Sequence, residues 1–353
     1  MRKSFTLSCL ILATVIGAGF ASGKEIQVFF SKFGVVSFFT IVLTFFIFLF
    51  AIRLLLKYSL TFKPDNIFIV NKQLFGKFSA IFNTFILLCY CIVLSGMYAG
   101  IYEVYLTVFS LFLSKILTII TVFIVVFILC GGLNRINNFN NLFIPITIIL
   151  LIISAIFSLK NNNISINLDL KSNVLNAVFS AVNYVGINIL LSSSILILSG
   201  KNYTKKQINL AAIISSLVIV FLIFLFNFVL INNNVSSNLP MQIISSNINF
   251  LWGIIVLICI WVAVFSSILS VSFTIVSVVN LNIKSNLVSV IIVSVLGYVF
   301  SMFGFSKIVE IFYPVIGVLG IILILTIFIK QTTMQNKKIN QIKPNNKNTL
   351  NFN

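Results

Sequence analysis

Histidine is absent from this 353-residue sequence, and charged residues are scarce. Without an imidazole, the chain can form no histidine-based proton relay, metal site or catalytic triad. Only 8% of the residues are charged and 60% are hydrophobic, whereas a soluble domain carries roughly a quarter charged residues. We therefore expect an all-α integral membrane protein, because lipid accepts spanning helices whose backbone groups are bonded internally.

The five cysteines, all inside apolar runs, show no metal-ligand spacing. We interpret them as small packing residues and expect no transition-metal site and no organic cofactor. The sequence also has no phosphate-binding loop, so it indicates neither an enzyme nor an ATP-driven pump.

The net charge of +18 reflects lysines and arginines placed between apolar runs. Because they form no continuous basic patch, we expect no nucleic-acid partner. If the N-terminus lies inside, the basic residues divide 17 against 6, the six being Lys24, Lys32, Lys115, Lys160, Lys171 and Lys307. The positive-inside rule then places both termini in the cytoplasm, with an even number of spans across the cell (plasma) membrane.

Ten apolar runs have about the length of a spanning helix. They cover residues 6–30, 35–56, 78–108, 115–130, 142–157, 174–198, 208–231, 250–279, 287–303 and 308–329. A cleavable signal peptide ending near Ala21 is the alternative interpretation of the first run.

A shift of 169 positions aligns the two halves of this pattern. It carries Pro145 onto Pro314 (314 − 145 = 169) and Gly17 onto Gly186 (186 − 17 = 169). Because five spans is an odd number, the second half must be inverted, which predicts a 5+5 inverted repeat. Chance similarity between apolar helices is the alternative.

The predicted organisation has four parts. They are a first repeat over 1–158, an extracellular linker over 159–173, an inverted repeat over 174–329 and a disordered basic cytoplasmic tail over 330–353.

In folds of this kind the first helix of each repeat is interrupted and the freed backbone forms a binding site. The first span contains a glycine-rich stretch, followed by a carboxylate: Gly17, Ala18, Gly19, Phe20, Ser22, Gly23 and Glu25. Its repeat mate contains Asn183, Gly186 and Asn188. We predict that helices 1 and 6 are interrupted there; the alternatives are close packing through Gly19 and Gly23, and interhelical hydrogen bonds from the asparagines.

Polar residues also follow one face of two other spans. The third span carries Cys91, Ser95, Tyr98, Tyr102 and Tyr105, and the eighth carries Cys259, Ala263, Ser266, Ser270, Thr274 and Ser277, with Ser267 beside them. The stripes suggest walls of a pathway, although hydroxyls also bond their own helix backbone at little cost.

Three acidic residues lie in or near spans. Glu25 follows the predicted break as a candidate partner for a proton or an amine, with a local pair to Lys24 or Lys32 as the alternative. Glu103 and Glu310 are expected at the membrane interface.

The stretch Gly17-Ala18-Gly19-Phe20-Ala21-Ser22-Gly23-Lys24-Glu25-Ile26, with Phe29-Phe30 and Phe33-Gly34 after it, resembles the first helix of YkvI-type membrane proteins. That family is classed with putative amino-acid permeases of the amino acid–polyamine–organocation superfamily, which shares the LeuT fold. The family usually has Gln where this chain has Lys24.

The resemblance implies roles for particular residues. The two glycine-containing segments would hold the substrate, with Tyr98 as a lid or hydrogen-bond partner. A Na⁺ site like that of sodium-coupled relatives would use the carbonyls of Ala13 and Ile16 and the hydroxyls of Ser266, Ser267 and Ser270.

The leading hypothesis is a symporter, coupled to Na⁺ or H⁺, that moves an amino acid or similar small zwitterion across the bilayer by alternating access. The alternative is a nutrient-sensing receptor subunit related to spore germinant receptors. The sequence identifies no protein partner, and a purely structural scaffold fits least because polar residues at mid-membrane depth are costly.

Overall fold

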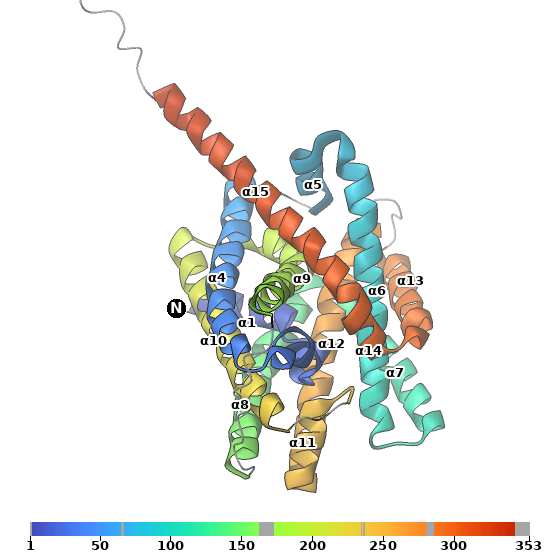
Figure 1. Cartoon of the computed structure of the whole chain (residues 1–353). Helices are drawn as coiled ribbons and strands as arrows, with labels where there is room; N and C mark the ends of the chain where they lie inside the picture. Colours follow the sequence, from blue (N-terminus) through green and yellow to red (C-terminus); the bar gives the residue numbers. More distant parts are fainter. Residues whose placement is uncertain are drawn as a thin grey trace, which may run out of the picture.

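The structure, a computed structural model, describes residues 2–64, 67–161, 173–233, 235, 237–279 and 286–342. Every regular element in this part of the chain is helical (Figure 1). The long helices are α4 (Val36–Phe62), α6 (Ser79–Leu106), α7 (Leu111–Leu129), α8 (Gly132–Asn161), α9 (Val174–Gly200), α10 (Lys205–Asn233), α12 (Phe250–Val279) and α15 (Tyr313–Ile342). The shorter ones include α1 (Arg2–Val15), α5 (Ile67–Phe75), α11 (Pro240–Ile248) and α13 (Asn286–Val299).

Eight helical stretches in the described residues are long and apolar enough to cross a membrane. Two further apolar helices, Lys3–Val15 and Leu287–Val299, are shorter than a full span. The chain is thus a multi-pass membrane protein, and the predicted number of ten crossings stays a prediction.

Helices α9 and α12 form the centre of the bundle. Within their most apolar 18 residues, 89% of α9 and 78% of α12 are buried, against 28% to 50% in the other six candidate spans. Figure 1 shows α9 enclosed by α4, α15 and α1. The outer helices present large apolar side chains such as Phe39 and Phe112, which are 74% and 75% exposed, as a lipid-facing surface requires.

The first apolar run is interrupted, as its glycines predict. Helix α1 ends at Val15, Ile16 and Gly17 are not helical, and two short helices follow, α2 (Ala18–Ala21) and α3 (Lys24–Phe29). Gly23 joins these two with a φ of +83°, which favours glycine. The backbone thus leaves the helical path twice within eight residues of Ile16.

The predicted interruption of the sixth span is wrong, because α9 is continuous through residues 183–188. A Cβ at Gly186 would overlap the backbone of Gly317 in α15, and a Cβ at Gly320 would overlap the carbonyl of Gly186. Here glycine allows two helices to approach closely instead of breaking one of them. Asn183 donates from Nδ2 to the carbonyl of Pro314 at 3.0 Å, which is the interhelical bond given as the alternative.

The last span begins with irregular turns: η3 (Phe300–Phe303), α14 (Phe305–Lys307) and a π-helical turn, η4 (Ile308–Phe312). Helix α15 continues to Ile342, so the predicted disorder is wrong for 330–342. No Pro or Gly occurs there, and extending an existing helix is easy compared with starting one. Residues 343–353 and most of the predicted linker lie outside the described residues.

Candidate functional site

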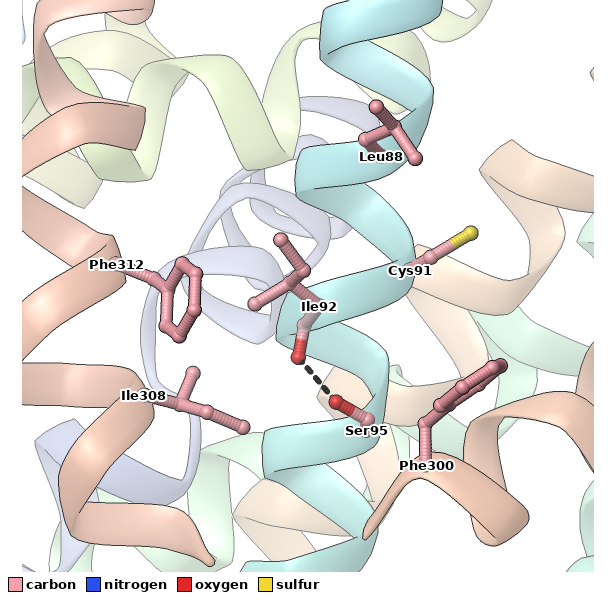
Figure 2. A pocket seen from close by; sticks show the side chains of 7 residues that line it. All are labelled: Leu88, Cys91, Ile92, Ser95, Phe300, Ile308 and Phe312. Carbon is pink, nitrogen blue, oxygen red and sulfur yellow. Dashed lines mark hydrogen bonds between the residues drawn. The ribbon is translucent and has the colours of Figure 1, made fainter. Parts of the chain in front are cut away.

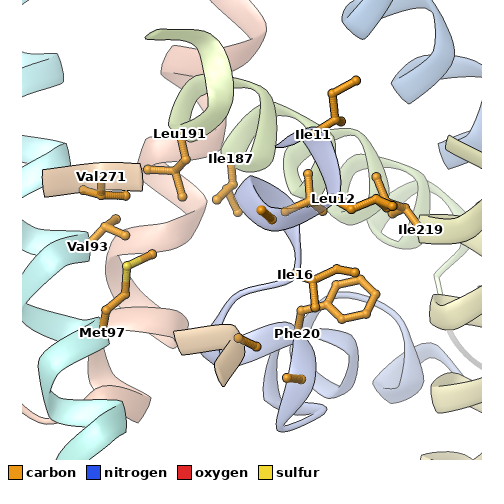
Figure 3. Close-up of a cluster of buried hydrophobic side chains, with 14 of the residues drawn as sticks. Ile11, Leu12, Ile16, Phe20, Val93, Met97, Ile187, Leu191, Ile219 and Val271 are labelled. Atoms are coloured by element: carbon orange, nitrogen blue, oxygen red, sulfur yellow. The ribbon is translucent and has the colours of Figure 1, made fainter. Parts of the chain in front are cut away.

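The break in the first span lies in the interior of the bundle. Figure 3 shows Ile16 and Phe20 next to each other beside the unwound stretch, with Val93 and Met97 of α6 and Ile187 of α9 across from it. Ile16 and Phe20 are fully buried. Because lipid cannot satisfy an unwound backbone, this enclosure by protein is what allows the break to persist.

Carbonyl and hydroxyl oxygens gather where α1 ends. Ser266 of α12 donates from Oγ to Asn140 Oδ1 of α8 at 2.8 Å and lies 3.5 Å from the Ala13 carbonyl. The Ser267 hydroxyl, buried and without a hydrogen bond among the described residues, would lie 2.9 Å from a Cβ at Gly17. These oxygens from α1, α8 and α12 are suited to binding a small hard cation.

Three of the five predicted cation-site residues therefore come together: Ala13, Ser266 and Ser267. Ser270 instead donates to the Ser266 carbonyl at 3.1 Å, one turn back along α12. Ile16 lies at the start of the break, directly before Gly17, with its N–H bonded to the Leu12 carbonyl at 2.7 Å. The role of its own carbonyl stays a prediction. Thr274 also bonds its own helix, as the alternative interpretation of this stripe predicts.

Glu25 is a buried carboxylate next to the break. Its side chain is 5% exposed and folds back over α2, so that it fills the space a Cβ at Gly19 would take. The carboxyl faces the hydroxyls of Tyr184 in α9 and Tyr313 in α15. The alternative of a local pair with Lys24 is not found, since Lys24 pairs with Glu310 in η4 (Nζ to Oε1, 2.9 Å).

An aromatic cluster fixes Tyr184 beside Glu25. The rings of Phe29, Phe30 and Phe48 lie with their centroids 5.6, 5.2 and 6.2 Å from that of Tyr184. The predicted site residue Asn188 also lies near this group; its Nδ2 donates to the Tyr184 carbonyl at 2.9 Å. Of the predicted residues of α9, Asn188 faces this group, whereas Asn183 and Gly186 face α15.

Contacts from several elements hold the segment of α2 and α3 in place. Met241 of α11 donates its N–H to the Ser22 carbonyl at 2.9 Å, and Ser180 of α9 donates from Oγ to the Phe29 carbonyl at 2.9 Å. The Lys24–Glu310 pair adds a link to the turn before α15. The segment is therefore anchored to α9, α11 and η4 at once.

Tyr98 is turned toward α13 in this structure, and its role as a lid or hydrogen-bond partner stays a prediction. Its ring packs where Gly297 of α13 lacks a side chain. Tyr105 is also turned elsewhere, toward Thr121 and Trp261, at 2.8 and 2.7 Å. The residues of α6 that face the break are instead Val93 and Met97 (Figure 3), because the polar stripe lies on the opposite side of the helix.

Three residues of the site were not predicted: Asn140, Tyr184 and Tyr313. Tyr184 lies between two predicted residues, and Tyr313 precedes the proline that marks the repeat. Asn140 belongs to an asparagine-rich stretch, 137–141, in which no sequence signal distinguishes it.

Comparisons with known proteins show the fold. MhsT in complex with L-phenylalanine is similar at a TM-score of 0.62 and 14% identity, over 91% of this chain and 88% of that one. Mhp1, a nucleobase-cation-symport-1 family transporter solved closed with bromovinylhydantoin bound, gives 0.60 and 15%, over 89% and 74%. A manganese transporter from Eremococcus coleocola, in complex with an aromatic bis-isothiourea compound, gives 0.57 and 11%, over 84% and 69%.

No protein-family model and no curated protein sequence matches the chain. At these identities the three structures establish the architecture: the chain has a LeuT-like transporter fold.

Proposed function

We propose that the chain is a secondary active transporter that moves an amino acid or similar small zwitterion, coupled to Na⁺ or H⁺, by alternating access. The observation that carries this proposal is the enclosed break at Ile16 and Gly17, with oxygens of Ala13, Ser266 and Ser267 on one side and Glu25 on the other. A buried helix break is costly, and transporters of this architecture use it to bind solute and ion.

The two sides of the break are suited to different ligands. The oxygens between α1, α8 and α12 are suited to Na⁺, and Glu25 is suited to an amine or a proton. Three solved transporters share the fold, one of them bound to L-phenylalanine, which supports transport over the receptor alternative. Membership in the YkvI-type family remains part of the proposal.

The inverted repeat is proposed on the element bounds. Helix α4 begins at Val36 and α10 at Lys205, which differ by the predicted 169 positions (205 − 36 = 169). Long α6 corresponds to long α12, and shorter α7 to α13. With the two short apolar helices counted as crossings, the chain has ten spans in two halves of opposite orientation.

Uptake into proteoliposomes by a Gly19→Leu variant tests the proposed site. A side chain at position 19 would displace the Glu25 carboxyl, so we expect uptake of a labelled amino-acid mixture to be lost while the protein still inserts. The control is Val42→Leu, on a lipid-facing position of α4 that is 60% exposed. Full uptake by Gly19→Leu would count against the site, and ligand binding by wild type without uptake would favour the receptor.

A further inference from the structure

Two cavities follow the face of α6 opposite to Val93 and Met97. The first, about 340 Å³ in volume, is lined by Leu88, Cys91, Ile92 and Ser95 of α6 together with Phe300, Ile308 and Phe312. Figure 2 shows Ile308 and Phe312 on one side of α6 and Phe300 on the other. Its one hydroxyl, Ser95 Oγ, is bonded to the Ile92 carbonyl at 2.7 Å, so the lining is apolar in effect.

The second cavity, about 490 Å³, continues along the same face and is polar. Tyr102 and Glu103 of α6, Lys115 of α7, and Tyr298 and Ser301 line it. It lies near the junction of α6 and α7, where α6 ends at Leu106 and α7 begins at Leu111. Spanning helices end at the membrane interface, so this cavity lies at headgroup depth.

The two cavities lie next to each other along α6 and the turn at Phe300 and Ser301. On α6, Leu88, Cys91, Ile92 and Ser95 line the first cavity, and Ala99, Tyr102, Glu103 and Leu106 follow on the same face and line the second. The consecutive residues Phe300 and Ser301 belong one to each. Together they form an apolar slot that points into the membrane from a polar mouth at its edge. The slot also faces the lipid side, since Leu88 and Phe300 are 53% and 50% exposed.

The mouth carries both signs of charge. Glu103 accepts a hydrogen bond from Asn238 Nδ2 at 3.1 Å and keeps its carboxylate beside the cavity. Lys115 lies across from it on α7 and has no salt bridge among the described residues. An ammonium suits the first and a phosphate the second.

We propose that the apolar slot and its polar mouth together bind one membrane phospholipid with a primary ammonium headgroup, of the phosphatidylethanolamine type. The ammonium lies at Glu103, the phosphate at Lys115, and one acyl chain lies in the slot against Ile308 and Phe312. Those two residues flank Glu310, the partner of Lys24. The bound lipid therefore supports the π-helical turn that anchors the candidate site.

Native mass spectrometry of the delipidated full chain tests the proposal. Phosphatidylethanolamine, phosphatidylcholine and phosphatidylglycerol are added singly, and the expected result is one tight adduct favouring phosphatidylethanolamine by about three- to fivefold, as for a half-exposed charged pair. Glu103→Gln should remove the preference over phosphatidylcholine, and Cys91→Trp, which fills the slot, should remove the adduct. The matched control is Ile258→Trp, in a separate groove of α12.

Photolabelling of the wild-type chain tests the proposed lipid site even if Cys91→Trp fails to fold. Phosphatidylethanolamine with a diazirine in its acyl chain should label residues 88–95 and 300–312 above the rest of the lipid-facing surface. Equal binding of the three lipids, or labelling spread evenly over the outer helices, would overturn the proposal.

Discussion

Substitution of Gly186 by alanine distinguishes a packing role from a substrate-binding role for the sixth span. The added methyl group would overlap the carbonyl of Gly317, which is backbone and cannot turn aside. Overpacking of this kind costs about 1–3 kcal/mol. Separating α9 from α15 also weakens the 3.0 Å bond from Asn183 to Pro314, and an interhelical bond is worth about 0.6 kcal/mol in membranes.

The sum predicts that Gly186→Ala lowers the stability of the folded protein by about 2–4 kcal/mol. Because membrane proteins in detergent commonly unfold irreversibly, the suitable assay is the rate at which folded protein is lost on heating. We expect this rate to rise at least about tenfold. Val315→Leu is the control, since it adds bulk to a position of α15 that is 62% exposed. A Gly186→Ala protein as stable as wild type but unable to transport would refute the packing role.

Three further substitutions test the site residue by residue. Ser267→Ala should raise the Na⁺ concentration needed for half-maximal uptake about tenfold, the value of one lost oxygen contact. Ser270→Ala should change this concentration little, because the Ser270 hydroxyl bonds its own helix. Equal effects of the two variants would mean that Na⁺ does not bind at Ser267. Glu25→Gln keeps the size of the side chain but removes its charge. The initial rate of uptake should therefore fall at least about tenfold, while the amount of folded protein stays unchanged. Uptake at the wild-type rate would exclude a role for the carboxylate. Lys24→Glu should reduce uptake with a stability change within about 1 kcal/mol, because Glu310 is 51% exposed, and adding Glu310→Lys should restore it; no rescue would mean that the pair does not matter for transport.

The break in the first span was predictable because its cause is local. Gly17, Gly19 and Gly23 lie within seven positions, and few packing arrangements require so many absent side chains. The predicted break at Gly186 was wrong because a single glycine between asparagines fits a break and a close helix contact equally well. Only the partner helix, with Gly317 and Gly320, distinguishes the two.

The direction of a polar stripe was not predictable for a related reason. Helical spacing shows that Tyr98 and Tyr105 share a side of α6, but the rotation of α6 in the bundle decides what that side faces. That rotation depends on contacts distant in sequence, such as Tyr98 against Gly297. Asn140 was missed for the same reason, since only the fold brings it to Ser266.

The measurement that tests the central claim most directly is uptake by the wild-type chain in proteoliposomes under a Na⁺ gradient, a H⁺ gradient or neither. Transport coupled at the break predicts that at least one labelled amino acid accumulates above its external concentration under one gradient only, and that Gly19→Leu abolishes this accumulation. Accumulation without a gradient dependence, or none for any amino acid under either gradient, would contradict the account.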